Sequence, residues 1–187
     1  MPRENVSNTD EAWLWAGSPN GGIVAENYER SSISADLAAL TTQVMLSVGV
    51  PLQAGETITS LSFLSGATAA GTPTNYWAAL YDTAGVLMAQ SADALTAAWA
   101  ADTAKTFTLS TVVAASVSGI YYAALMVKAT TVPTLMGRSV NRAAAAGVIA
   151  AGQKVLAQTS GSALVGTAPG TIATPTTVVN VPYVALR

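Results

Sequence analysis

The chain has 187 residues, a length that suits one domain, or one domain with an arm, better than two full domains. Only 10% of the residues are charged, against a usual share of about 25%, and the net charge is −2. This composition is typical neither of a disordered tail nor of an ordinary cytosolic enzyme, and the few, scattered bases give no support to nucleic-acid binding. The absence of cysteine and histidine excludes disulfides, imidazole bases and nearly every transition-metal site. A chain of this length can build a self-sufficient core, and we expect no metal and no cofactor.

Residues 1–36 are predicted to form an extended N-terminal arm, because they hold six of the ten acidic residues and show little hydrophobic periodicity. The first residues carry charge of both signs and no apolar run, so no secretory signal is expected. Trp13 and Trp15 lie two residues apart and thus on one side of an extended chain. These two side chains either fold back onto the domain or anchor the arm on a partner.

Residues 37–187 are predicted to form a β-sandwich domain. Along Val44–Val50, apolar residues occupy every second position, which predicts a half-buried strand that ends at Pro51. In the next strand, Leu61 and Phe63 share one side, whereas Ile58 is out of phase with them. A β-bulge is therefore expected near Ile58.

A hairpin is predicted from Tyr76–Asp82 and Val86–Ala92. Between these strands, Asp82 and Gly85 occupy the first and fourth positions of the turn, which suits a type I turn with glycine in the left-handed conformation at a bulge. Both faces of the first strand are apolar, so this strand is expected to be covered on both sides or to lie under a loop.

Further strands are predicted in the segments KTFTLS, GIYYAALMVKA and VVNVPYVALR. The segments NYWAAL and IYYAAL are interpreted as two central strands. The apolar run Ala143–Gly152 is only ten residues long, half of a membrane span, so no membrane helix is expected. Residues 143–157 are compatible with a short helix or with loops. The predicted fold class is all-β, an antiparallel β-sandwich or jelly roll.

The search for catalytic motifs is mostly negative, and no enzyme is predicted. Gly147–Lys154 differs from a phosphate-binding loop, because lysine does not follow the second glycine directly and Val155 replaces the hydroxyl residue. A carboxylate pair for glycoside hydrolysis would have to come from turn residues. The candidates outside the arm are Glu56, Asp82, Asp93 and Asp102.

Aromatic side chains leave a carbohydrate-binding role open. Tyr76, Trp77, Trp99 and Tyr121 either stack on a sugar ring or fill space in the core.

The charged residues are divided unequally along the chain: residues 1–102 hold ten acids and two bases, whereas residues 103–187 hold six bases and no acid. The two halves either interleave in one sandwich or meet head to tail between subunits.

Two segments of the sequence carry a resemblance to a known family, ITSLSFLSGATAAGTPTNYWAALYDTAG and GIYYAALMVKATTVPTLMG. Together with the alanine-flanked Trp99, these segments resemble the jelly-roll virion proteins of tailed phages that infect actinobacteria. The similarity covers roughly Thr57–Gly137 and includes no catalytic motif. It implies a non-enzymatic protein of the particle surface, made in the host cytoplasm.

Two non-enzymatic roles and one catalytic role follow as hypotheses. The first is a capsid decoration or minor capsid protein that binds the major capsid protein from outside. The second is a tail-associated adhesion module for host-surface glycans, and the third is a hydrolase of wall polysaccharide. Self-association is expected for the first two, with a trimer as the working hypothesis and neither nucleic acid nor membrane as a partner.

Overall fold

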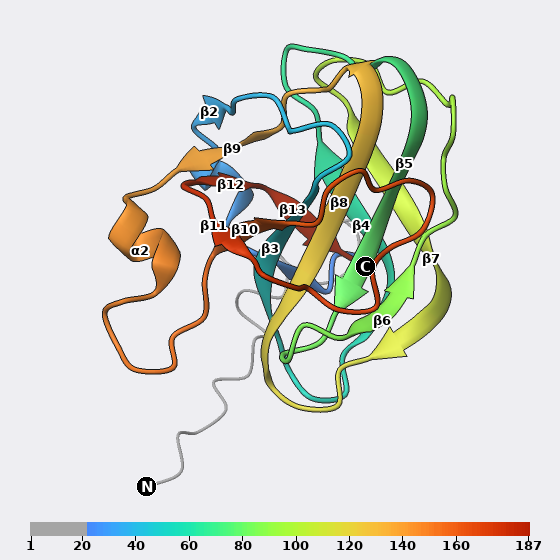
Figure 1. Cartoon of the computed structure of the whole chain (residues 1–187). Coiled ribbons are helices and arrows are strands. Elements are labelled where there is room, and N and C mark those ends of the chain that lie inside the picture. Colours follow the sequence, from blue (N-terminus) through green and yellow to red (C-terminus); the bar gives the residue numbers. More distant parts are fainter. Residues whose placement is uncertain (1–21) are drawn as a thin grey trace, which may run out of the picture.

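The computed structural model describes residues 22–187, which form an all-β sandwich (Figure 1). One sheet has four strands in the order β1-β13-β4-β7, the second has six in the order β11-β10-β3-β8-β5-β6, and a third, small sheet has the order β12-β9-β2. All strand pairs are antiparallel, so the prediction of an all-β, antiparallel sandwich is confirmed, whereas the jelly-roll topology stays a prediction. The strands are β1 (Ala25–Glu26), β2 (Ala35–Asp36), β3 (Met45–Leu52), β4 (Thr57–Leu64), β5 (Gly71–Tyr81), β6 (Leu87–Gln90), β7 (Ala104–Ala114), β8 (Gly119–Thr131), β9 (Met136–Ser139), β10 (Ala157–Ser160), β11 (Thr176–Thr177), β12 (Asn180–Pro182) and β13 (Val184–Leu186).

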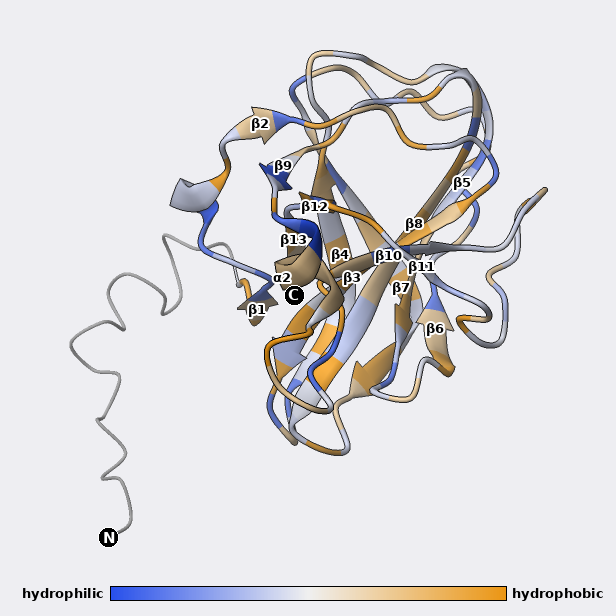
Figure 2. Cartoon of the chain, turned by 60° about the vertical axis from the view of Figure 1, so that its left-hand side comes forward, coloured by the Kyte–Doolittle hydropathy of each residue, from blue (hydrophilic) through white to orange (hydrophobic). Residues whose placement is uncertain are grey.

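The main core lies between the four-stranded and the six-stranded sheet. Phe63 of β4 and Phe107 of β7 contribute from one sheet, and Val48 of β3 and Tyr121 of β8 from the other. Because successive side chains of a strand point to opposite faces, apolar and polar residues alternate along the central parts of β4 and β7 (Figure 2). The inward placement expected for Phe107 and Leu109 is confirmed, since both are buried in this core.

Two local features agree with the sequence pattern. The pairing of β4 with β7 shifts register between Ile58 and Ser60, which confirms the expected bulge. In the β5–β6 turn, the amide of Gly85 donates to the carbonyl of Asp82 at 3.0 Å, and Gly85 has a φ of 79°. The Asp82 carboxylate accepts from the amides of Ala84 and Val86, both at 2.8 Å, so the predicted turn is confirmed.

The segments NYWAAL and IYYAAL form neighbouring strands in the middle of the six-stranded sheet. They pair in β5 and β8, where Tyr81 lies opposite Tyr122 and Leu80 opposite Ala123. Their interpretation as two central strands is confirmed, because β8 lies between β3 and β5, and β5 lies between β8 and β6.

The second face of the six-stranded sheet is also buried. Met45, Trp77, Tyr81 and Met126 form an apolar cluster on this face. The prediction of a half-buried strand at Val44–Val50 is therefore wrong in this respect, because Met45 and Ser47 are as buried as the inward-facing valines.

Residues 161–174, here called the strap, cover this second face and cross β8 and β5 (Figure 1). The phenol of Tyr81 donates to the carbonyl of Pro169 at 2.8 Å, and the strap amide of Ala168 donates to the Gln90 side chain at 2.8 Å. The prediction that the first hairpin strand is covered on both sides is confirmed, since the core covers one side and the strap the other.

The described part of the predicted arm is paired with the sandwich. β1 lies beside β13, with Ala25 opposite Leu186, and β2 lies beside β9, with Ala35 opposite Gly137. A short 3-10 helix, η1 (Arg30–Ser32), connects β1 to β2. Residues 22–36 thus contribute to two sheets, whereas residues 1–21 lie outside the described part of the chain.

The segment that the sequence left open between helix and loop contains both. The helix α2 (Arg142–Ala146) is capped by the Asn141 side chain, which accepts from the amide of Ala143 at 2.8 Å. It ends at Gly147, whose φ of 67° suits glycine. The helix and the following loop stand to one side of the sandwich (Figure 1).

Candidate functional site

The four aromatic residues considered for sugar binding are buried. Tyr76, Trp99 and Phe107 pack together in the main core, with Tyr76 stacked on Trp99 at a centroid distance of 6.1 Å. The Tyr121 hydroxyl donates to the carbonyl of Val117 at 2.9 Å and is also enclosed. Trp77 lies on the opposite face, beneath the strap.

A sugar ring therefore cannot stack on any of these four side chains in this structure. Trp99 is 2% exposed and the other three are fully buried. The same holds more widely, because every aromatic side chain in residues 22–187 is buried or half-buried. The interpretation that these side chains fill space agrees with the structure. Trp13 and Trp15, the expected partner-binding residues, lie outside the described residues.

Three of the four carboxylates considered for hydrolysis accept hydrogen bonds from backbone amides. Glu56 accepts from the amide of Gln53 at 2.8 Å, and Asp82 holds the β5–β6 turn as described above. Asp93 accepts from the amides of Tyr76 and Leu95 at 2.9 and 3.0 Å. These bonds give three of the four candidates a structural role, and nothing in the structure assigns a catalytic role to Asp102.

A cluster of two tyrosines, a glutamate and an arginine connects β1 and the residues after it to β9 and to the junction of β12 and β13. The Tyr183 hydroxyl donates to the Glu26 carboxylate at 2.6 Å, and Tyr28 meets Tyr183 edge to face at 5.9 Å. The guanidinium of Arg138 lies 4.4 Å from the centre of the Tyr28 ring.

Burial shifts the titration of both phenols in this cluster. Burial raises the pKa of Tyr28 to about 12, although the nearby Arg138 opposes that shift. Burial also raises the pKa of Tyr183, and the hydrogen bond to Glu26 adds to the effect. Arg138 Nε is buried without a hydrogen-bond partner. We interpret this cluster as a structural clasp, because its members hold β1 against the small sheet.

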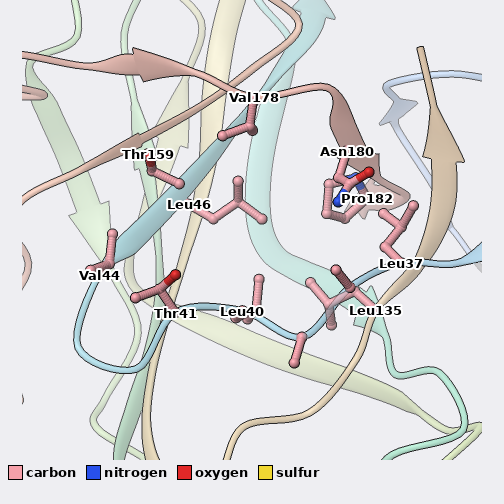
Figure 3. A pocket seen from close by; sticks show the side chains of 12 residues that line it. Leu37, Leu40, Thr41, Val44, Leu46, Leu135, Thr159, Val178, Asn180 and Pro182 are labelled. Carbon is pink, nitrogen blue, oxygen red and sulfur yellow. The ribbon is translucent and has the colours of Figure 1, made fainter.

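An apolar cavity of about 130 Å³ lies between residues 37–44 and the strands β10 and β12 (Figure 3). Its wall is mainly aliphatic, and the side chains of Leu40, Leu46, Leu135 and Val178 converge on it. Thr41, Thr159 and Asn180 supply its polar groups. The exposed residues Ala38 and Thr41 belong to the segment that borders its opening.

The segment that borders the cavity is fastened at its two ends. The amide of Leu37 donates to the carbonyl of Leu135 at 2.9 Å. At the other end, the Gln43 amide donates to Val127, and the Gln43 carbonyl accepts from the strap residue Leu164 at 3.0 Å. Gln43 has a φ of 59°, an uncommon value for a residue with a side chain.

A second apolar feature lies on the loop after α2. Val148 is 67% exposed and Ile149 is 80% exposed, and the neighbouring residues Ala150 and Ala151 are exposed as well. We call residues 148–151 the apolar tip. The segment Gly147–Lys154, which was compared with a phosphate-binding loop, thus forms a helix cap and a projecting loop. The ammonium of Lys154 donates to the carbonyl of Thr83 at 3.1 Å.

Sequence reasoning did not predict the cavity, the clasp or the apolar tip as features of interest. The cavity unites residues from Leu37 to Pro182, and no local pattern connects them. For the tip, the signal was present in the uninterrupted apolar run Ala143–Gly152, but its exposure depends on the fold.

Comparisons with known proteins add no relative: no family model, no curated protein and no solved structure matches the chain. Within residues 22–187, no three acidic side chains come together as a metal site would require, and no helix is long and apolar enough to cross a membrane.

Proposed function

We propose that the chain is a non-enzymatic structural protein of a phage virion, a decoration or minor capsid protein that binds the outside of the capsid shell. The proposal is motivated by the resemblance of Thr57–Gly137 to virion proteins, a stretch that runs from β4 into β9. Its partner is the major capsid protein, and self-association, with a trimer as the working hypothesis, accompanies binding.

The observation that carries this proposal is the short, uncharged side chains on the outer face of the four-stranded sheet. Thr106, Thr108 and Ser110 are exposed on alternate positions of β7, and Ser62 on the neighbouring strand is hydrogen-bonded to Thr106 at 2.8 Å. Short side chains lose little conformational entropy when a partner orders them. A face of this kind suits a protein that lies permanently against other subunits.

Reinforcement of the shell would be mechanical. A rigid sandwich that contacts two neighbouring capsid subunits adds buried area between them, and binding to the assembled shell alone stabilises that state by mass action. No reacting group is required for this role.

The first test is the copy number of the protein in purified particles, measured by quantitative mass spectrometry against the major capsid subunit. The proposal predicts a simple fraction of the capsid subunit count. A trace amount would indicate a tail location instead, and glycan binding would then be the next measurement. Absence from particles would overturn the virion role.

The predicted anchor is tested with a double variant, Trp13→Ala with Trp15→Ala, in the full chain. Removing residues 1–36 is unsuitable, because β1 and β2 belong to the sheets. We expect the double variant to lose binding to capsids while its thermal unfolding is unchanged. Leu14→Ala is the matched control, because Leu14 lies between the two tryptophans and points away from them in an extended chain.

A further inference from the structure

The apolar tip and the apolar cavity complement each other in size and chemistry. We propose that the tip of one copy of the chain inserts Ile149 into the cavity of a second copy. The contact is a head-to-tail interface between identical chains. It does not depend on capsid binding, so it can be tested with the purified protein alone.

The tip offers a side chain that its own fold leaves in water. Ile149 is 80% exposed and therefore does not occupy the cavity of its own chain. Val148 beside it is 67% exposed, so two large aliphatic groups stand together on a projecting loop. Burying one such side chain strengthens association about tenfold or more, which favours an interface at this position.

The cavity has a suitable volume and lining. An engineered cavity of about 150 Å³ lined by aliphatic and aromatic residues binds benzene, a six-carbon group. At about 130 Å³, the cavity between residues 37–44 and β10 is of the same class, and the isoleucine side chain has only four carbons. The converging leucine and valine side chains provide an apolar wall for it (Figure 3).

Charge favours the same pairing. The exposed cations Arg142 and Lys154 flank the segment that carries the tip, and no charged residue lies between them. The exposed residue Asp36, whose carboxylate accepts from the amide of Ala67 at 2.9 Å, directly precedes Leu37, which lines the cavity. Opposite charges on the two sides would orient the approach of tip and cavity.

An interface of this kind joins two different surfaces, so an open assembly carries one unused tip at one end and one unused cavity at the other until it closes. Such contacts form rings where the rotation closes and open chains where it does not. Self-association of the wild-type chain is therefore expected to increase with concentration.

The test uses three full-length variants and sedimentation velocity over a range of concentrations. Ile149→Asp removes the apolar side chain from the tip, and Thr41→Trp places an indole at the opening of the cavity. We expect each to weaken self-association about tenfold or more, which is the effect of losing one buried aliphatic side chain. Val117→Asp is the matched control, because Val117 is 52% exposed in the loop between β7 and β8 and belongs neither to the tip nor to the cavity lining. Unchanged thermal unfolding verifies that all three variants are folded.

Mixing the two defective variants distinguishes this interface from a symmetric one. Ile149→Asp retains an intact cavity and Thr41→Trp retains an intact tip, so an equimolar mixture should form a one-to-one dimer and nothing larger. A mixture that stays monomeric, a wild-type chain that is monomeric up to its solubility limit, or normal association of Ile149→Asp would each overturn the proposal. Loss of association only in the Trp13→Ala, Trp15→Ala variant would overturn it as well and assign self-association to the N-terminal segment.

Discussion

The indole nitrogen of Trp77 donates a hydrogen bond of 2.6 Å to the carbonyl oxygen of Val165, 88 residues later in the chain. This bond joins the middle of the six-stranded sheet to the strap. The Val165 side chain itself is half exposed, so its burial contributes little to holding this part of the strap. The hydrogen bond from Trp77 holds it instead. The ring of Trp77 is thereby shielded from water.

The first prediction concerns this bond. Trp77→Phe keeps a large ring but leaves the carbonyl of Val165 without its partner, and we expect a loss of about 1–3 kcal/mol in the free energy of unfolding. Urea denaturation followed by circular dichroism measures it. The control is Val165→Ala, which keeps the carbonyl and should change stability little. Equal stability of Trp77→Phe and wild type would show that the bond is dispensable.

A second prediction concerns the fit of the strap over Asp93. A Cβ atom on Gly166 would lie 2.6 Å from the Asp93 carboxylate, which is itself held by the amides of Tyr76 and Leu95. Because this carboxylate cannot move freely, Gly166→Ala should cost about 1–3 kcal/mol in the free energy of unfolding. At Gly170, in the same strap, an added Cβ meets nothing within 4 Å. Gly170→Ala should therefore be close to neutral, and equal effects of the two substitutions would contradict the packing described here.

A third prediction separates the acceptor role of Asp82 from its charge. Asp82→Ala removes the acceptor of two backbone amides, those of Ala84 and Val86, and should destabilise the fold by about 1–2 kcal/mol. Asp82→Asn retains a carbonyl oxygen and should recover most of that loss. Chemical denaturation of the two variants measures their free energies of unfolding. If Asp82→Asn is as unstable as Asp82→Ala, the negative charge of Asp82, and not its acceptor oxygen, stabilises the turn.

The fourth prediction is a loss of stability at alkaline pH. The pKa of Tyr28 is raised from its ordinary value of 10.0 to about 12 in the folded chain, so the neutral phenol favours folding. This contribution is fully present below pH 10 and is lost as the pH rises through about 12, because the unfolded chain then releases the proton first. Urea midpoints measured from about pH 9 to about pH 12 should fall, in step with tyrosinate absorbance.

Substitution of Arg138 identifies the phenol responsible. The positive charge of Arg138 opposes the rise of the Tyr28 pKa, so Arg138→Met should raise that pKa further and delay tyrosinate formation. The neutral side chain also removes the buried Nε that has no partner. Arg142→Met, an exposed position on α2, is the matched control and should leave the titration unchanged.

Local patterns predicted the parts of the fold that local chemistry determines. The β5–β6 turn followed from Asp82 and Gly85 alone, because the carboxylate and the left-handed glycine act within four residues. The bulge near Ile58 followed from a break in strand periodicity. Neither prediction required knowledge of distant contacts.

Contacts between distant segments determine the rest. The burial of Met45 depends on a strap more than 100 residues later, so periodicity alone indicated a half-buried strand. The choice between sugar stacking and core packing for Trp77 and Trp99 was open for the same reason, since an aromatic residue in a strand suits either role. The cavity between Leu37 and Pro182 likewise exists only after the chain has folded.

The position of β13 has a consequence for synthesis of the chain. Residues 184–186 lie inside the four-stranded sheet, between β1 and β4, and not at its edge. On the ribosome, β4 can pair with β7 early, but β1 has no partner in this sheet until residue 186 has left the exit tunnel. The N-terminal segment must therefore wait for β13, so this sheet is completed only by the strand that is synthesised last among its four.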